Sequence, residues 1–294
     1  MIFIIVKCHL LKNEKIDNSN IKIYYNNLMA MNNNNKVVIN DLNEILLIPI
    51  DKLTLLQYLT FGYSFNQPLY NSLDKLTCLQ YLTFGMFFNK PLTNSLDKLT
   101  SLQNLTFSHT FNQPLSNSLD KLTCLKHLNF GCCFNKPLSN SLNKLKSLQY
   151  LNFHDNFNQP LSNSLVELTS LQYLTLGYKF NQHIDLPSNI KYLVLDCNNQ
   201  YIIDNLHNNI EELEFVHSFN LELDNLPSSI KKIVIYNNNY DKELNNLPSS
   251  VECISLPQNY KKKIFNIPKS LKEIYCNKNY EFINDFSNCQ VSFI

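Results

Sequence analysis

An internal repeat of 23 residues dominates the sequence and limits the folds that the chain can adopt. Copies of the string L-Q-Y-L-T-F and its close variants begin at Leu56, Leu79, Leu102, Leu125, Leu148 and Leu171. A second string, F-N-[QK]-P-L-x-N-S-L, begins at Phe65, Phe88, Phe111, Phe134 and Phe157, and survives in part at Phe180. One copy is too short to bury its own apolar side chains, so neighbouring copies must stack to share a continuous core.

The register continues beyond residue 184 with a shorter period of 19 to 21 residues. The link between the strand-like segments there reads L-P-S-S-[IV], as at 226–230. One degenerate unit precedes the long copies, with Lys36-Val37-Val38-Ile39 as its strand and Leu46 and Ile50 at the expected offsets. The sequence therefore predicts about 11–12 coils, counting this capping unit.

These periods define three segments of the chain. Residues 1–32 form an N-terminal segment that is either poorly ordered or a cap, with a strand at 21–25. Residues 33–184 carry the 23-residue units, and residues 185–294 carry the shorter units and a C-terminal cap. We expect the two arrays to form one continuous solenoid.

The spacing of apolar residues indicates the local structure. In L-x-x-L-x-F the last two apolar positions are two apart, as one face of a strand requires. Periods of 19 to 23 lie at the leucine-rich-repeat range. The prediction is thus a leucine-rich-repeat-like solenoid of the α/β class, mostly β, with a parallel sheet on its concave face. Asn-Ser pairs before Leu-Asp predict a serine N-cap and one short helical or 3-10 turn per long unit on the convex face. The shorter links are expected to be nearly extended.

The two repeated strings together resemble a known family. Phe65-Asn66-Gln67-Pro68 and Leu226-Pro227-Ser228-Ser229-Ile230 match the two halves of the FNIP repeat, a relative of the leucine-rich repeat. The resemblance covers about residues 33–285 and implies a repeat protein of amoebal or large-DNA-virus type. Some members carry an N-terminal F-box, which would imply a ubiquitin-ligase adaptor. Leu42-Asn43-Glu44-Ile45-Leu46 matches the opening of that domain only in part, so no clear F-box is present.

Composition excludes several classes of function. All 25 basic residues are lysine, and the formal charge is +1, which disfavours a nucleic-acid partner because arginine supplies the bidentate contacts to phosphate and guanine. The nine cysteines form no C-x-x-C pair, and the seven histidines fall in no metal or catalytic motif. We therefore expect no catalytic residue, metal or cofactor. The apolar run at the N-terminus ends at Lys7, so no membrane segment is expected, and reduced thiols indicate a cytoplasmic protein, in the host cell if the chain is viral.

The exposed side of the predicted strands provides the candidate binding face. The third residue of each L-x-x-L motif points outward, and six of these residues are the candidate partner contacts. They are Tyr58, Tyr81, His127, Tyr150, Tyr173 and Tyr192. Stacked tyrosines offer rigid contact area at low entropic cost, as protein interfaces favour. Alternatively, cross-strand tyrosine and threonine pairs only stabilise the sheet.

A conserved spacing also places one asparagine after each inserted phenylalanine. These residues are Asn66, Asn89, Asn112, Asn135, Asn158 and Asn181. An amide can satisfy backbone groups at a bend, so we expect an internal hydrogen-bond ladder there.

The leading hypothesis is a non-enzymatic scaffold that binds a partner protein, of unknown identity, on the concave strand face. A ubiquitin-ligase substrate adaptor, an enzyme with a site assembled from loops, and an expanding repeat with little selected function remain alternatives. The oligomeric state is left open.

Overall fold

The chain folds as a leucine-rich-repeat-like solenoid of parallel strands with almost no helix, which confirms the predicted fold class. The computed structural model describes residues 5–6, 36–39, 54–161 and 164–294. The chain divides into two compact units. Unit 1 comprises residues 1–148 with Glu167–Thr169, and unit 2 comprises Gln149–Val166 and Ser170–Ile294.

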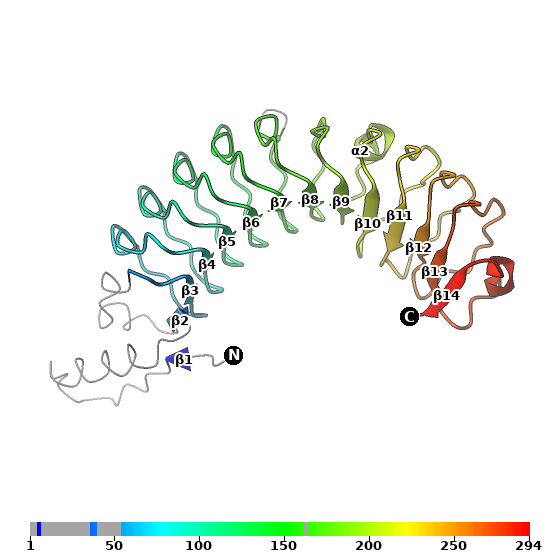
Figure 1. The fold of residues 1–294 in the computed structure, drawn as a ribbon, viewed down its shortest axis with the longest axis horizontal. Helices are drawn as coiled ribbons and strands as arrows, with labels where there is room; N and C mark the ends of the chain where they lie inside the picture. Colours follow the sequence, from blue (N-terminus) through cyan, green and yellow to red (C-terminus); the bar gives the residue numbers. More distant parts are fainter. Residues whose placement is uncertain (1–4, 7–35, 40–53, 162–163) are drawn as a thin grey trace. The chain divides into compact units, whose positions relative to one another are not determined.

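Unit 1 contains one short strand per coil. The strands are β1 (Ile5–Val6), β2 (Lys36–Ile39), β3 (Tyr58–Phe61), β4 (Tyr81–Thr83), β5 (Asn104–Thr106) and β6 (His127–Asn129). Each pairs in parallel with the next (Figure 1). Equivalent repeat positions face each other, as in the pair Tyr58 and Tyr81. β2 is the strand expected for the degenerate first unit, whereas Leu46, Ile50 and the strand expected at 21–25 lie outside the described residues.

Unit 2 continues the same plan with eight strands among its described residues. They are β7 (Tyr150–Asn152), β8 (Tyr173–Leu176), β9 (Tyr192–Leu195), β10 (Glu212–Phe215), β11 (Lys232–Ile235), β12 (Cys253–Ser255), β13 (Glu273–Cys276) and β14 (Gln290–Phe293). They also pair in parallel and in sequence order. The change of period at residue 185 therefore leaves the strand register intact, because Tyr173 on β8 still pairs with Tyr192 on β9.

The repeated leucines and phenylalanines form the core. In the coil that begins at Leu56, the side chains predicted to be buried are at most 2% exposed. Phenylalanines of successive coils stack on one another, as in Phe88 and Phe111, whose ring centroids lie 6.2 Å apart with nearly parallel planes. Within one coil, the strand-end Phe107 stacks on the inserted Phe111 at 4.3 Å. Burial of each such side chain stabilises the fold by about 1.5–3 kcal/mol, and here that burial requires the neighbouring coil.

The links of the long coils differ from their prediction in one respect. Backbone hydrogen bonds from Ser72 to Leu69, from Asp74 to Asn71 and from Leu76 to Leu73 form a series of overlapping turns. However, the Ser72 hydroxyl donates back to the carbonyl of Leu69, so it does not accept the backbone N–H bond that defines an N-cap. The predicted serine cap is therefore wrong at this coil. A serine hydroxyl carries a donor as well as acceptors, and a carbonyl has two lone pairs, so the Leu69 carbonyl accepts both the backbone N–H and the hydroxyl of Ser72.

Two helical segments lie among the described residues of unit 2, one in a short coil, where an extended link was expected, and one in the predicted C-terminal cap. These are α2 (Gln200–Asp204) and the 3-10 helix η2 (Ile283–Phe286). α2 buries Ile202 and Ile203, and its N-terminal Asn199 makes no side-chain cap. Burial of the two isoleucines, and not local helix propensity, therefore holds this turn in place.

Candidate functional site: the outer strand face

The outer strand face consists of the third and fifth residues of each L-x-x-L-x-[FL] motif. Along β3 to β13 these side chains are half-buried, except for the buried Val234, while the apolar residues between them are buried. The alternation follows from the pleat of a strand, which sends successive side chains to opposite faces. The third-position column reads Tyr58, Tyr81, Asn104 and His127 in unit 1, and Tyr150, Tyr173, Tyr192, Glu212, Lys232, Cys253 and Glu273 in unit 2.

The tyrosines of this column form two stacked ladders. In unit 1 the rings of Tyr58 and Tyr81 lie 4.4 Å apart. In unit 2 the centroids of Tyr150 and Tyr173 lie 4.1 Å apart, and those of Tyr173 and Tyr192 lie 4.0 Å apart with planes only 3° from parallel. Ring stacking holds each side chain in one orientation, so the ladder presents a rigid edge with hydroxyl groups along it.

His127 stands in the same column of unit 1, paired with Asn104. Burial, with a smaller contribution from the charge of Lys126, lowers the pKa of the His127 imidazole below its usual value. The side chain is therefore predominantly neutral at pH 7 and offers a hydrogen-bonding ring, not a cation.

Beyond Tyr192 the column becomes charged. Lys232 pairs with Glu212 at 3.2 Å. The Tyr275 hydroxyl, in the fifth-position column, donates to the Glu273 carboxylate at 3.3 Å. Unit 2 thus presents an aromatic stretch followed by a polar, carboxylate-rich stretch on the same face.

The asparagine ladder lies at the bend after the strands, away from this face. The backbone N–H of Asn89 donates to Asn66 Oδ1 at 2.9 Å, and that of Asn112 donates to Asn89 Oδ1 at 3.0 Å. The same bond joins Asn135 to Asn112 and, in unit 2, Asn181 to Asn158. Each amide oxygen therefore satisfies a backbone donor of the next coil, which gives these residues a part in coil stacking.

Cysteines and histidines are not gathered into a site within the described part of the chain. No group of three or more His, Cys, Asp or Glu residues there is placed to hold a metal ion. The described cysteines are free thiols. Burial raises the pKa of the Cys197 thiol to about 12, so this group stays protonated at neutral pH.

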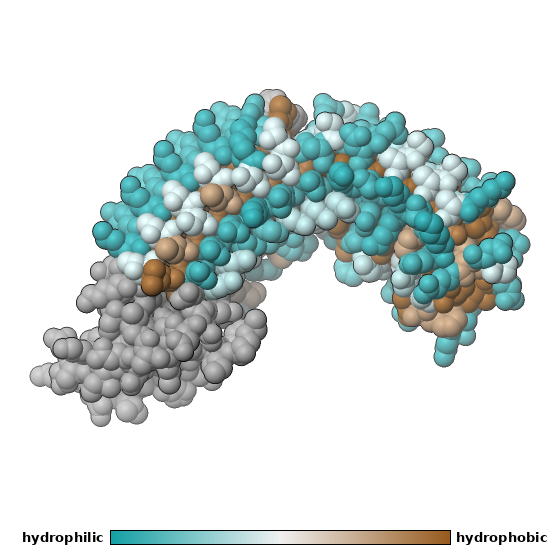
Figure 2. All heavy atoms as spheres, in the orientation of Figure 1, coloured by the Kyte–Doolittle hydropathy of each residue, from teal (hydrophilic) through white to brown (hydrophobic). Residues whose placement is uncertain are grey.

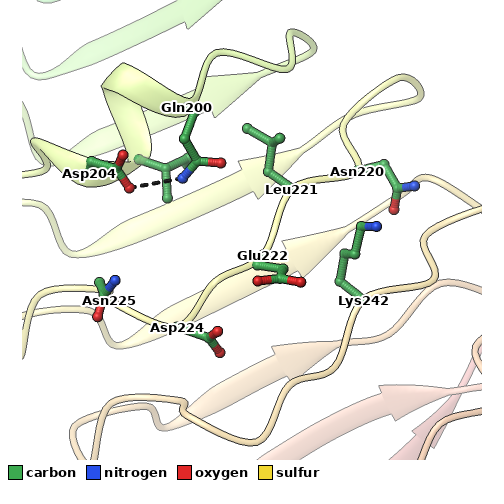
Figure 3. Close-up of a pocket in the computed structure, with 9 residues that line it drawn as sticks. Gln200, Asp204, Asn220, Leu221, Glu222, Asp224, Asn225 and Lys242 are labelled. Atoms are coloured by element: carbon green, nitrogen blue, oxygen red, sulfur yellow. Dashed lines mark hydrogen bonds between the residues drawn. The ribbon is translucent and has the colours of Figure 1, made fainter.

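A hollow lies on the link side of unit 2, between α2 and the two following links (Figure 3). Glu222, Asp224 and Lys242 line it, and the Gln200 amide donates to Asp204 Oδ1 at 2.8 Å. The hollow is open to solvent. Asp204 comes from α2, Glu222 and Asp224 come from the link after β10, and no three of the described acidic groups here are placed to hold a metal ion.

The structure places the six sequence-predicted contact residues on one face of their strands, in two groups. The sequence analysis did not single out Tyr236 and Tyr275, which line the polar stretch of unit 2. Ile274 is the fourth residue of its strand motif, so the repeat register alone places Tyr275 in the fifth-position column. The segment that partly matches an F-box, 42–46, lies outside the described residues. Where the structure describes the chain, its helices are too short to cross a bilayer.

Comparison with known proteins supports this architecture. Residues 217–259 match the model of the FNIP repeat. CroV588, a circular LRR protein from a giant virus, is 26% identical with a TM-score of 0.57; the alignment covers 82% of this chain and 43% of that one. The chain thus spans less than half the length of this relative. No curated protein matches the sequence.

Two further solved structures share the fold at lower identity. Toll, in its Drosophila complex with Spatzle, is 15% identical with a TM-score of 0.55, over 84% of this chain and 38% of that one. TLR13, in its complex with ssRNA13, is 16% identical with a TM-score of 0.52, over 88% of this chain and 42% of that one. The chain is therefore a repeat solenoid of the leucine-rich-repeat type. More particularly, residues 217–259 resemble the FNIP repeat, as the sequence motifs predict.

Proposed function

We propose that this chain is a non-enzymatic scaffold whose outer strand face binds an extended segment of a partner protein. The observation that carries the proposal is the ladder Tyr150, Tyr173 and Tyr192, which stands half-buried on β7 to β9 with ring spacings of 4.0–4.1 Å. Tyrosine is enriched in protein interfaces because it buries a large area while losing little side-chain entropy. Stacking removes part of that remaining entropy in advance, which favours binding.

A sheet needs no such ladder for its own stability at every coil. Asn104 and His127 occupy the same column in unit 1, and their strands pair in the same register as the tyrosine-bearing strands. The tyrosines are therefore replaceable as structural elements, which supports a role in recognition.

The chemistry of the face favours a protein over a nucleic acid. Structures with a similar fold contain either kind of ligand, since the Toll structure contains Spatzle and the TLR13 structure contains RNA. Here the chain has no arginine, and Glu212 and Glu273 stand in the column that continues the ladder. Carboxylates at these positions would repel a phosphate backbone.

Site-specific photo-crosslinking tests this proposal. A benzophenone amino acid replaces Tyr173 on the outer strand face in one variant and Tyr178 in another. Tyr178 lies in the same coil, 55% exposed at the bend after β8, and so provides a matched control. In cells that express the full chain, we expect a defined protein adduct from position 173 and none of the same mass from position 178.

A second variant, with Tyr150, Tyr173 and Tyr192 all changed to Ala, should abolish capture of that partner while its circular dichroism stays unchanged. Equal adducts from both crosslinking positions, or capture that survives the triple change, would remove the outer strand face as the binding site.

A further inference from the structure

A hollow on the outer strand face of unit 2 follows the tyrosine ladder. It lies over β10 to β13 and has a volume of about 380 Å³. Its lining residues are Glu214, Lys232, Val234, Tyr236, Cys253, Ser255, Glu273 and Tyr275. The lining thus combines small side chains and two tyrosine rings with three charged groups.

Its charge balance is negative. Lys232 is the one cation in the lining, and it is already paired with Glu212 at 3.2 Å. Among the described residues the Glu214 carboxylate makes no hydrogen bond or ion pair, and Glu273 accepts only the bond of the Tyr275 hydroxyl at 3.3 Å. Two carboxylates therefore remain without a cationic partner of their own.

The negative charge of the hollow shifts the pKa values of neighbouring groups. Burial opposes the charge of Lys232, but the carboxylates of Glu212 and Glu214 outweigh it and raise the pKa of the lysine. Burial, and then the charge of Glu273, raises the pKa of the Cys253 thiol. The thiol is therefore protonated and uncharged at neutral pH, so it adds no reactivity to the hollow.

The exposed apolar side chains of unit 2 offer a different kind of contact. On the side drawn in Figure 2 the surface of the described residues is mainly hydrophilic and carries several hydrophobic patches, one of them near the end of unit 2 that carries β14. Phe293 and Ile294, which are 63% and 54% exposed, lie at that end. Nothing in the structure indicates what covers them, whereas the hollow is defined by its charge.

We infer that the partner of the outer strand face is an extended protein segment carrying two basic side chains, which bind Glu214 and Glu273. This inference rests on the proposed function and adds the chemistry of the ligand. Electrostatic complementarity of this kind fixes the register of a bound segment and accelerates its association.

Strand geometry sets the spacing of the two basic residues. Glu214 holds the fifth position of the motif on β10 and Glu273 the third position on β13. The two are therefore three strands apart, about 14 Å at about 4.8 Å per strand, and two residues apart along the strand direction, about 7 Å. An extended peptide that crosses the strands advances about 3.4 Å per residue and presents alternate residues to one face. Basic residues at positions i and i+4 stand about 14 Å apart on one face, and their long side chains span the remaining offset to the two carboxylates, whereas positions i and i+3 point to opposite faces.

Peptide binding to the intact chain provides the test. The probes are fluorescein-labelled peptides of alternating threonine and serine that carry two arginines, either at i and i+4 or at i and i+3. Matched peptides carry two glutamates or two glutamines at i and i+4. We expect the i, i+4 arginine peptide to bind most tightly by fluorescence anisotropy, with an affinity that falls as salt is added.

The double variant Glu214→Gln and Glu273→Gln should weaken that binding by about tenfold or more. The control variant Glu222→Gln with Glu281→Gln makes the same change of charge on exposed residues elsewhere in unit 2, and should leave the affinity within about twofold. Equal affinity for both arginine spacings, or full binding to the Glu214 and Glu273 variant, would overturn the inference.

The two proposals fail in distinguishable ways. If the crosslinked partner, or a glutamine peptide, still depends on Tyr150, Tyr173 and Tyr192 but not on Glu214 and Glu273, the face binds protein and the cationic ligand is wrong. If the arginine peptide depends on the carboxylates while position 173 yields no partner adduct, the hollow binds cations and the tyrosine face is not the interface.

Discussion

The long coils before residue 185 and the short coils after it use different chemistry to hold the same coil together. In the long coils, the inserted residue is phenylalanine and stacks on its neighbours without a polar group, as Phe88 does on Phe111. In the last short coils, the same position is tyrosine, and its hydroxyl donates to a carbonyl of the preceding coil. Tyr260 bonds to the Lys242 carbonyl at 3.1 Å, and Tyr280 to that of Lys262 at 2.7 Å.

A second column changes in the same way. The residue after the first leucine of the strand motif is glutamine in most long coils. In the short coils it alternates in charge, through Lys191, Glu211, Lys231, Glu252 and Lys272. Glu211 pairs with Lys191 at 3.2 Å and with Lys231 at 2.8 Å. In these two columns the long coils carry an apolar ring and an uncharged amide, whereas the short coils carry a hydrogen-bonded hydroxyl and paired charges.

The largest expected loss of stability comes from disturbing the close backbone packing between long coils. All four glycines of the chain follow the strand of a long coil, and a Cβ on Gly131 would lie 1.6 Å from the carbonyl oxygen of Ser108. We expect Gly131→Ala to destabilise the chain by more than about 3 kcal/mol, because backbone atoms of the neighbouring coil must move. The matched change Val216→Ala, at the equivalent position of a short coil, only removes methyl groups and should cost under about 1 kcal/mol. Urea denaturation of both variants measures the difference, and equal losses would contradict this view of the long coils.

A reciprocal exchange of phenylalanine and tyrosine gives the next largest expected loss of stability. Phe111 is fully buried, so Phe111→Tyr places a hydroxyl in a hydrocarbon stack, at an expected loss of about 2–3 kcal/mol. Tyr260→Phe removes one hydrogen bond and leaves the Lys242 carbonyl without this donor, so we expect the free energy of unfolding to fall by about 1 kcal/mol. Thermal unfolding by circular dichroism ranks the two. If Tyr260→Phe proves the more harmful, the long coils tolerate polar groups and the contrast in core chemistry is wrong.

The sequence predicts the repeated part of the fold because each constraint recurs in every copy. The apolar positions, the strand register and the extent of the core all follow from the two strings. The N-terminal degenerate unit was also recognisable, from the strand at Lys36–Ile39. Details that occur once were not predicted. α2 has a sequence, Q-Y-I-I-D, that carries two β-branched residues and no capping side chain, so only its tertiary burial selects a helix.

The candidate site was predictable in position but not in ligand chemistry. Alternation along a strand places Tyr173 and Glu273 on one face from sequence alone. Which carboxylate lacks a cation depends on contacts between coils, such as the pairing of Lys232 with Glu212 and not with Glu214. Those contacts depend on side-chain conformation, which the period of the repeat does not specify.

The charged column of the short coils gives the smallest expected effect and the one that depends on pH. Hydrogen bonds from Lys231 and then Lys191 lower the pKa of Glu211 below its ordinary value. A carboxylate whose pKa is lowered in the folded state stabilises the fold above its unfolded pKa of about 4.5, and this contribution is lost as the pH falls through the lowered folded value. Glu211→Gln should therefore reduce stability by up to about 1 kcal/mol at pH 7 in low salt, and by nothing once the wild-type carboxylate is protonated.

Denaturation midpoints of Glu211→Gln and the wild type, measured from pH 7 down to acid and again in high salt, test this expectation. Glu222→Gln serves as the control, because Glu222 is exposed and makes no ion pair with the described residues. A deficit that persists unchanged in acid or in high salt would mean that Glu211 acts through packing, since Coulomb pairing must weaken under both conditions. The charged column would then resemble the glutamine column of the long coils, and only the tyrosine hydroxyls would still separate the two kinds of coil.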